Sequence, residues 1–204
     1  MGFLLGKIDS ELYKKSAEML LKVVTRICYN ILMINYLSLV MIFTTLFFSG
    51  CSNKEYFINS AKKHNLNHHT LRAIAEVESG NRSNVVNVNE SIFNIQQGPH
   101  YFDNWFTANL YMDTILDPLF LSYDVGVCQI NISHFDRNGL DNEDLLDDEI
   151  NIELAAKILR YNLNKCGGDY NCALSMYNTG KRDSETGRYY TYKVLKARKK
   201  LFGY

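Results

Sequence analysis

The stretch Asn67-His68-His69-Thr70-Leu71-Arg72-Ala73-Ile74-Ala75-Glu76-Val77-Glu78-Ser79-Gly80 decides the fold. Asn67 is a good N-cap, apolar residues recur at helical spacing from Leu71, and Gly80 ends the helix. Seven residues beyond Leu71, the same face reaches Glu78. Burial disfavours an ionised carboxyl group and raises its pKa, which suits a general acid. The alternative is a Glu at the rim of the domain that reaches solvent or pairs with a cation such as Arg82.

The composition predicts one mainly helical domain. The chain has 204 residues, of which 47% are hydrophobic and only two are proline, and this favours a helical protein with one sizeable core. Lys and Arg together number 22, as do Asp and Glu, so the formal net charge is zero. Without a basic excess, nucleic acid is not an expected partner. The cysteines and the five histidines show no metal-ligand spacing, and we expect no metal and no other cofactor.

Residues 1–50 predict a signal peptide or a membrane anchor. No charged residue occurs between Arg26 and Lys54, and residues 31–48 are mostly apolar, which is long enough to enter or cross a bilayer. Small residues before Cys51 resemble the cleavage site of a bacterial lipoprotein, so Cys51 is the expected site of lipid attachment. An uncleaved anchor is the alternative. Both predictions place the remaining chain in the periplasm or cell envelope, held at the membrane.

Beyond this segment, the pattern predicts a tether over residues 51–66 and a single domain over residues 67–204. The predicted elements are a strand at 84–89 in a hairpin that ends near residue 95, a helix at 103–116, an apolar segment at 122–131, and helices at 152–163, 169–179 and 189–200. The fold class is therefore mainly α, with helices around a small β element.

Three cysteines lie in the predicted domain. Cys166 and Cys172 are six residues apart around two glycines, close enough to form a disulfide in an oxidising compartment. Cys128 would then be a small buried hydrophobic residue.

Three short stretches hold the unusual polar residues: Glu78-Ser79, the segment from Gly126 to Asn131, and Tyr177-Asn178. Each follows or ends an apolar element, so their side chains can converge on a cleft. Gln129 and Asn131 offer donors and acceptors that match the hydroxyl and amide groups of a sugar chain. Tyr177 offers a ring face and a hydroxyl, and Asn178 can hold the carboxyl group or the substrate. Taken singly, each has a structural alternative: Gln129 can cap a helix and Tyr177 can belong to the core.

In this order, the stretches resemble the lysozyme-like lytic transglycosylases of the SLT type, glycoside hydrolase family 23. The matching motifs are Glu78-Ser79, Gly126-Val127-Cys128-Gln129-Ile130, Asn151-Ile152 and Tyr177-Asn178-Thr179-Gly180. The form Asp124-Val125-Gly126 and the segment Asn87-Val88-Asn89 look more like the enzymes of secretion and conjugation machines. The resemblance covers residues 56–195. The separation of 51 residues between Glu78 and Gln129 is longer than in the simplest members.

The resemblance implies an α+β lysozyme-like domain with a small β element beside the active-site cleft. It implies cleavage of the β-1,4 bond between N-acetylmuramic acid and N-acetylglucosamine in peptidoglycan, with 1,6-anhydro ends. Glu78 would be the catalytic residue. The residues implied to contact the substrate are Ser79, Gln129, Asn131, Tyr177 and Asn178.

Further implications of the resemblance remain open. The partners would be peptidoglycan strands and, for the subtype, a secretion or conjugation machine. The C-terminal Glu-Thr…Tyr pattern survives as Glu185-Thr186, but either Tyr189 or Tyr190 could take the role of the tyrosine. A hydrolase like goose-type lysozyme is one alternative, and it needs a second carboxylate. A non-catalytic module that binds peptidoglycan or a secretion apparatus is the other.

Overall fold

The computed structural model describes residues 52–91, 94–119, 121–133 and 140–203. The elements are α2 (Ser52–Lys63), α3 (His68–Glu78), β1 (Val85–Val88), β2 (Gly98–Tyr101), α4 (Trp105–Tyr111), η1 (Met112–Leu116), η2 (Asp117–Leu119), β3 (Tyr123–Val125), β4 (Ile130–Asn131), η3 (Asn142–Leu146), α5 (Asp148–Lys165), α6 (Tyr170–Thr179) and α7 (Glu185–Phe202). The predicted signal or anchor segment and Cys51 lie outside the described residues. None of the helices in the described ranges is both long and apolar enough to cross a membrane.

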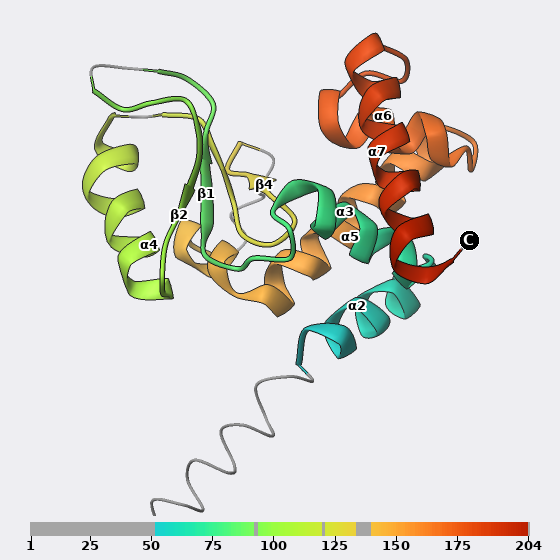
Figure 1. Cartoon of the computed structure of the whole chain (residues 1–204), viewed down its shortest axis with the longest axis horizontal. Helices are drawn as coiled ribbons and strands as arrows, with labels where there is room; N and C mark the ends of the chain where they lie inside the picture. The colour runs from blue at the N-terminus through green and yellow to red at the C-terminus, as the bar shows by residue number, and fades with distance from the viewer. Residues whose placement is uncertain (1–51, 92–93, 120, 134–139, 204) are drawn as a thin grey trace, which may run out of the picture. The chain divides into compact units, whose positions relative to one another are not determined.

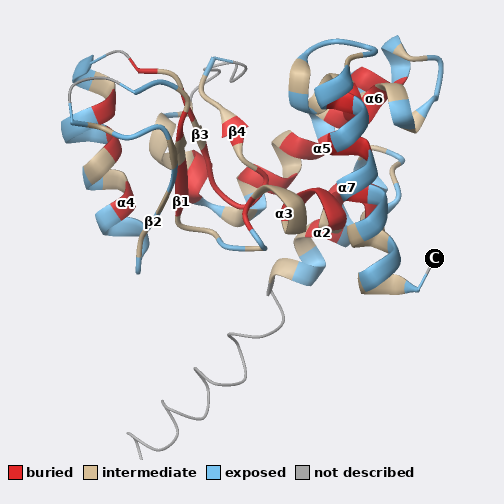
Figure 2. Cartoon of the chain, turned by 45° about the horizontal axis from the view of Figure 1, so that its top comes forward, coloured by how far each residue is buried: buried red, intermediate tan, exposed pale blue. Residues whose placement is uncertain are grey.

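Helices α3 and α5 lie between two other groups of elements (Figure 1). The sheet and α4 lie on one side of them, and α6 and α7 lie on the other. Buried residues concentrate on α3, α5 and β1, where these groups meet (Figure 2). The prediction of a mainly helical domain with a small β element is confirmed.

Helix α3 follows its predicted pattern from cap to cap. The side chain of Asn67 accepts a hydrogen bond from the backbone N–H of His69, and Leu71 and Ile74 are completely buried. Ser79 is the C-cap, and Gly80 takes the left-handed conformation with φ of +65°, which glycine adopts without strain. The helix therefore ends directly after Glu78.

The prediction of a tether at residues 51–66 was wrong. Residues 52–63 form helix α2, which packs on α5, and Phe57 and Ala61, four residues apart, are each only 2% exposed. The carboxyl group of Glu153 on α5 lies 2.6 Å from Nζ of Lys63 and 2.7 Å from Nε2 of His64. An apolar pair at helical spacing that is buried against a neighbouring helix makes α2 part of the domain.

The described strands form an antiparallel sheet in the order β2-β1-β3-β4. The predicted strand at 84–89 is confirmed as β1, but its hairpin partner is β2, which begins beyond residue 95. In the register of the sheet, Asp124 lies opposite Asn87 on one side and Asn131 on the other. These three polar residues therefore form a row across one face of the sheet. The predicted helix at 103–116 is α4 followed by the π-helical turn η1.

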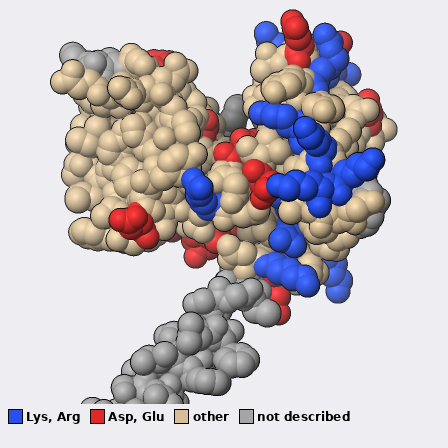
Figure 3. All heavy atoms as spheres, viewed as in Figure 1, with Lys and Arg blue, Asp and Glu red and all other residues tan. Residues whose placement is uncertain are grey.

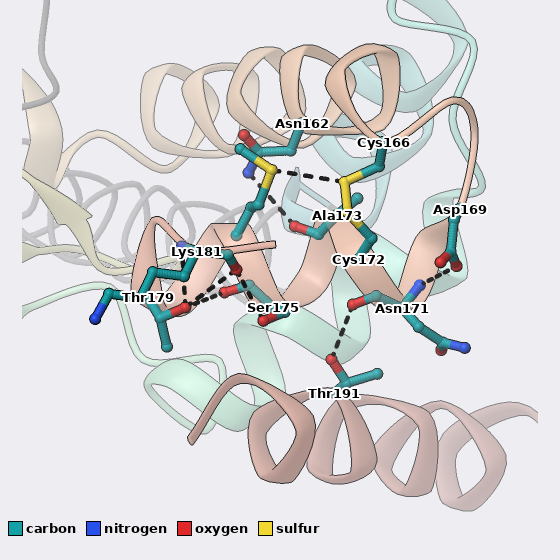
Figure 4. The surroundings of a disulfide bond; sticks show 11 residues. Asn162, Cys166, Asp169, Asn171, Cys172, Ala173, Ser175, Thr179, Lys181 and Thr191 are labelled. Atoms are coloured by element: carbon teal, nitrogen blue, oxygen red, sulfur yellow. Dashed lines mark hydrogen bonds between the residues drawn. A yellow bond between two sulfur atoms is a disulfide. The ribbon is translucent and has the colours of Figure 1, made fainter. Parts of the chain in front are cut away.

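Helices α5, α6 and α7 end and pack as their sequences require. The side chain of Asp169 caps α6, and Gly180 with φ of +68° ends it. A disulfide joins Cys166 and Cys172 at the connection from α5 to α6, with 5.9 Å between their Cα atoms (Figure 4). Cys128 is free and buried, as predicted.

Helix α7 is longer than predicted because it begins at Glu185, where Ser184 is the N-cap. It approaches α6 closely at Gly187, where a Cβ atom would overlap the side chain of Ser175. Helix α7 also packs on α3.

Candidate active site

Glu78 lies at the last turn of α3, where its carboxyl group meets α7. The hydroxyl of Tyr190 donates a hydrogen bond of 2.6 Å to Oε1 of Glu78. Burial raises the pKa of Glu78 from 4.5 to about 7; the hydrogen bond from Tyr190 opposes this rise, the negative charge of Asp124 adds to it, and the positive charge of Lys193 opposes it. At neutral pH the carboxyl group is therefore near half protonation, the condition for donating and then accepting a proton. Arg82 is not its partner, because no ion pair joins them among the described residues.

The structure distinguishes between the two adjacent tyrosines of α7. Tyr190 is 2% exposed and bonded to Glu78, whereas Tyr189 is 64% exposed. The helical period explains this difference, since Tyr190 lies one turn before the buried Val194. Tyr190 is the residue that contacts the acid.

Replacing Tyr190 with Phe is expected to raise the pKa of Glu78 further, because the hydrogen bond that lowers it is removed. The alkaline limb of the pH–rate profile should move to higher pH. The maximal rate should fall roughly 10- to 100-fold, since the carboxyl group loses the contact that orients it. The control is Tyr192→Phe, on the exposed side of the same helix. An unchanged profile in the Tyr190 variant would contradict a role for its hydroxyl.

The turn between β3 and β4 is held beside Glu78 by Asn151, a fully buried residue in the first turn of α5. Its Oδ1 accepts a hydrogen bond of 2.8 Å from the backbone N–H of Cys128. Its Nδ2 donates to the carbonyl oxygens of Val125 at 2.8 Å and Leu145 at 2.7 Å. Gly126 has φ of +81°, and a Cβ atom there would overlap Asn151 and the Leu145 carbonyl. Glycine is therefore required at position 126, because Asn151 and the Leu145 carbonyl pack closely under the turn.

Ser79 and Tyr177, both predicted to contact the substrate, hold this turn from the other side. Ser79 is 6% exposed, and its hydroxyl donates a hydrogen bond of 2.8 Å to the carbonyl oxygen of Val127. Tyr177 donates from its hydroxyl to the carbonyl oxygen of Cys128 at 3.0 Å, and its ring lies parallel to that of Tyr190 at 6.4 Å. Because Ser79 is buried with its hydroxyl bonded to the backbone, it positions this turn.

Gln129, Asn131 and Asn178 differ in their surroundings. Gln129 has φ of +52°, and its Nε2 donates to the carbonyl oxygens of Val85 and Gly126. Asn131 donates from Nδ2 to Oδ1 of Asp124 at 2.6 Å. Asn178 is exposed at the end of α6. The first two side chains therefore have structural bonds in the free protein.

Asp124 accepts hydrogen bonds from three amide donors that lie on β1, just after β1 and on β4. Asn87 donates to Oδ2 at 3.1 Å, Asn89 donates to Oδ1 at 3.4 Å, and Asn131 donates to Oδ1 at 2.6 Å. Because the charge of Asp124 raises the pKa of Glu78, the polar row of the sheet lies within electrostatic reach of the acid. The two carboxyl groups therefore have different environments. That of Glu78 is buried beside Tyr190, and that of Asp124 is bonded to side-chain amides.

Residues 55–199 match the family described as the transglycosylase SLT domain. The chain belongs to this family. It is a lytic transglycosylase with the lysozyme-like α+β fold, and it acts on peptidoglycan in the cell envelope. No curated protein and no solved structure showed a significant match.

The SLT domain is hollowed between the part that contains β2 and α4 and the part that contains α6 and α7 (Figure 3). Two other surface hollows, of about 510 and 410 Å³, lie elsewhere, because neither is lined by a residue of the site around Glu78. Within the described ranges, no three His, Cys, Asp or Glu side chains gather in a way that could hold a metal ion. His134 lies outside those ranges.

Some residues of the SLT site were missed in the sequence. Asn151 was read only as part of a helix motif, although a buried Asn in the first turn of a helix signals bonds to neighbouring backbone. In the sequence, Asp124 is noted only as part of the motif Asp124-Val125-Gly126, and its amide partners follow only from strand pairing. Lys193 carried no signal, because its relation to Glu78 depends on how α7 crosses α3.

Proposed function

We propose that this transglycosylase cleaves the β-1,4 bond between N-acetylmuramic acid and N-acetylglucosamine and leaves 1,6-anhydro ends. The observation that carries the proposal is the state of Glu78. Its pKa of about 7 keeps a large fraction of the carboxyl groups protonated at neutral pH, and its Oε1 is bonded to Tyr190. A single group with this pKa can act first as an acid and then as a base.

The orientation of that carboxyl group supports the following steps. Because Oε1 accepts from Tyr190, the proton is carried on Oε2, from which it passes to the glycosidic oxygen as the bond to the muramic acid C1 breaks. The acetamido group of the substrate stabilises the oxocarbenium-like centre. Glu78, now a carboxylate, removes the proton from the C6 hydroxyl, and the C6 oxygen bonds to C1. No water is consumed, and Glu78 ends protonated as it began.

Four side chains are proposed to contact the substrate beside Glu78. Tyr177 presents the ring that lies parallel to Tyr190, and Asn178 is exposed at the end of the same helix. Gln129 donates from its amide nitrogen to the protein, so its carbonyl oxygen is the atom proposed to meet sugar hydroxyl or amide groups. Asn131 donates to Asp124 and accepts from the backbone N–H of Ser133, so it is proposed to contact the substrate by exchanging one of these bonds.

The products test the proposed reaction. Peptidoglycan incubated with residues 52–204, which contain the whole described core, is expected to release muropeptides one water lighter than reducing muropeptides. Mass spectrometry before and after borohydride treatment measures this, because an anhydro end resists reduction. Products with reducing ends would contradict the anhydro-forming reaction.

One observation favours a second candidate, hydrolysis. Asp124 is a second carboxylate, and its charge acts on Glu78. A hydrolase would use such a group to activate or position water. The three amide donors around Asp124 argue for the first reaction, because they compete with a water for the carboxylate oxygens. Reducing ends that disappear in an Asp124→Asn variant would support hydrolysis.

A role beside a secretion or conjugation machine is proposed from the sequence pattern around Asp124 and from the added segment between β1 and β3, which contains α4. Lipid attachment at Cys51 or an uncleaved anchor is likewise proposed, and would hold the enzyme at the membrane. Labelling of cells with a radioactive fatty acid, compared with a Cys51→Ala variant, distinguishes the two forms of anchoring.

A further inference from the structure

Two positively charged side chains lie on opposite sides of the site around Glu78, each against tyrosine rings. The guanidinium carbon of Arg82 is 4.7 Å from the centre of the Tyr101 ring. The Nζ atom of Lys193 is 5.5 Å from the Tyr189 ring and 5.7 Å from the Tyr190 ring. Neither cation forms an ion pair within the part of the chain that the structure describes. An aromatic face attracts a cation and restricts its position without neutralising its charge.

Arg82 is fixed at the sheet side of the site. Its backbone N–H donates a hydrogen bond of 3.0 Å to the hydroxyl of Ser79, the residue that follows Glu78. Tyr101 is at the end of β2, pairs with Val85 in the sheet, and is 56% exposed. The guanidinium is therefore held in the open, between the end of α3 and the edge of the sheet.

Lys193 is fixed at the helical side. It is exposed on α7, three residues beyond Tyr190, whose hydroxyl bonds to Glu78. Its positive charge lowers the pKa of Glu78, so it lies within electrostatic reach of the acid. In Figure 3, Lys and Arg side chains gather over the part with α6 and α7, whereas few cover the part with β2 and α4.

We propose that Arg82 and Lys193 bind carboxylates on the lactyl side chains of muramic acid residues on either side of the cleaved bond. This rests on the proposed function, because it assigns the substrate class of the same site. The muramic acid side chain ends either in a peptide that carries carboxylates or, where the peptide is absent, in the lactyl carboxylate itself. A guanidinium and an ammonium group both form charge-assisted hydrogen bonds with a carboxylate. The enzyme thus prefers strands whose muramyl side chains are negatively charged.

The test measures binding without turnover. Glu78→Gln protein is sedimented with insoluble peptidoglycan, and Arg82→Gln and Lys193→Gln are added to this background. Because position 78 then carries no titratable group, the influence of Lys193 on the pKa of Glu78 does not enter. Each substitution should weaken binding about two- to fivefold, the range of an exposed ion pair. The matched control is Lys196→Gln, since Lys196 also lies over a tyrosine ring of α7 but does not act on Glu78.

Three forms of peptidoglycan identify the group that is bound. The first is native, the second has its peptides removed by an amidase, and the third has its carboxylates converted to methylamides. The differences between the variants and their Glu78→Gln parent should vanish on the methylamide form. If a variant still binds more weakly than its parent after the peptides are removed, the bound group is the lactyl carboxylate. If this difference disappears, the bound group is a carboxylate of the peptide.

Equal binding of the Arg82 and Lys193 variants and their parent to native peptidoglycan would overturn the proposal. The proposal would also be overturned if the variants lost as much binding on the methylamide form as on native peptidoglycan. The proposed function is judged separately, from the products of the wild-type protein, so that failure of cleavage and failure of carboxylate binding are distinct results.

Discussion

Glu78→Gln is expected to reduce peptidoglycan cleavage about a thousandfold or more, because the variant loses both the proton donor and the base. The amide has the size of the carboxyl group, and its oxygen can still accept the hydrogen bond from Tyr190. Release of muropeptides by the purified variant measures the effect. Circular dichroism and sedimentation with peptidoglycan provide the controls for folding and binding. Cleavage at a rate near that of the wild-type protein would rule Glu78 out as the catalytic group.

The same substitution should stabilise the protein above neutral pH. In the folded state the pKa of Glu78 is raised from 4.5 to about 7, so the folded protein holds the proton more tightly than the unfolded chain does. The wild-type protein therefore loses stability as the pH rises from about 4.5 to about 7. At about 1.4 kcal/mol for each pH unit, the loss is about 3 kcal/mol.

The Gln variant has no such loss, because an amide does not ionise. Relative to the wild-type protein, its midpoint of thermal unfolding should rise between pH 5 and pH 8 by roughly 6–12 °C. Thermal unfolding at four or five pH values across this range measures the difference. If the unfolding midpoints of the two proteins changed with pH in parallel, Glu78 would ionise as an exposed glutamate does. Its pKa would then not be raised toward neutral pH.

Asn151→Asp is expected to destabilise the domain by about 3 kcal/mol or more. The substitution keeps the shape of the side chain, but replaces Nδ2 by an oxygen that faces the carbonyl oxygens of Val125 and Leu145. Each buried carbonyl left without a donor costs about 1–3 kcal/mol. Unfolding in urea measures the loss. At urea concentrations too low to unfold the variant, its activity should also be reduced, because Asn151 no longer holds the turn that contains Cys128.

The matched control is Asn162→Asp on the same helix. Asn162 is also buried, but its side chain makes one long hydrogen bond of 3.4 Å to the carbonyl oxygen of Ala173, so the loss should be smaller. The deficit of the Asn151 variant should shrink at low pH, where a protonated Asp can donate one hydrogen bond again. Equal losses at the two positions would mean that burial alone, and not the bonds to the turn, sets the effect.

The sequence determined those features that depend on local spacing. Helix α3 was defined by its N-cap Asn67, by apolar residues at helical spacing from Leu71, and by Gly80 at its end. The same helical spacing placed Glu78 on the face toward the core. Asp169 and Gly180 bounded α6 in the same way. These predictions succeeded because helix caps and helical periodicity involve residues only a few positions apart.

Errors arose where a local pattern was weak and a distant partner decided the structure. Residues 51–66 were predicted to be a tether, and within them the apolar pair Phe57 and Ala61 is small beside many polar residues. The helix is stabilised by its contact with α5, including the bonds from Lys63 and His64 to Glu153. Tertiary packing of this kind leaves little trace in a short stretch of sequence.

The active site shows the same division. The sequence by itself predicted Glu78 as the acid and placed the motifs that begin at Gly126 and at Tyr177, since each lies at the end of an element that it helps to define. Only the tertiary structure decided that Tyr190 contacts Glu78, that Ser79 holds a turn, and that Asp124 lies among three amides. These contacts join residues from different helices and strands, up to 112 positions apart. They depend on the crossing of α3 with α7 and on the strand register, which packing of the whole core sets.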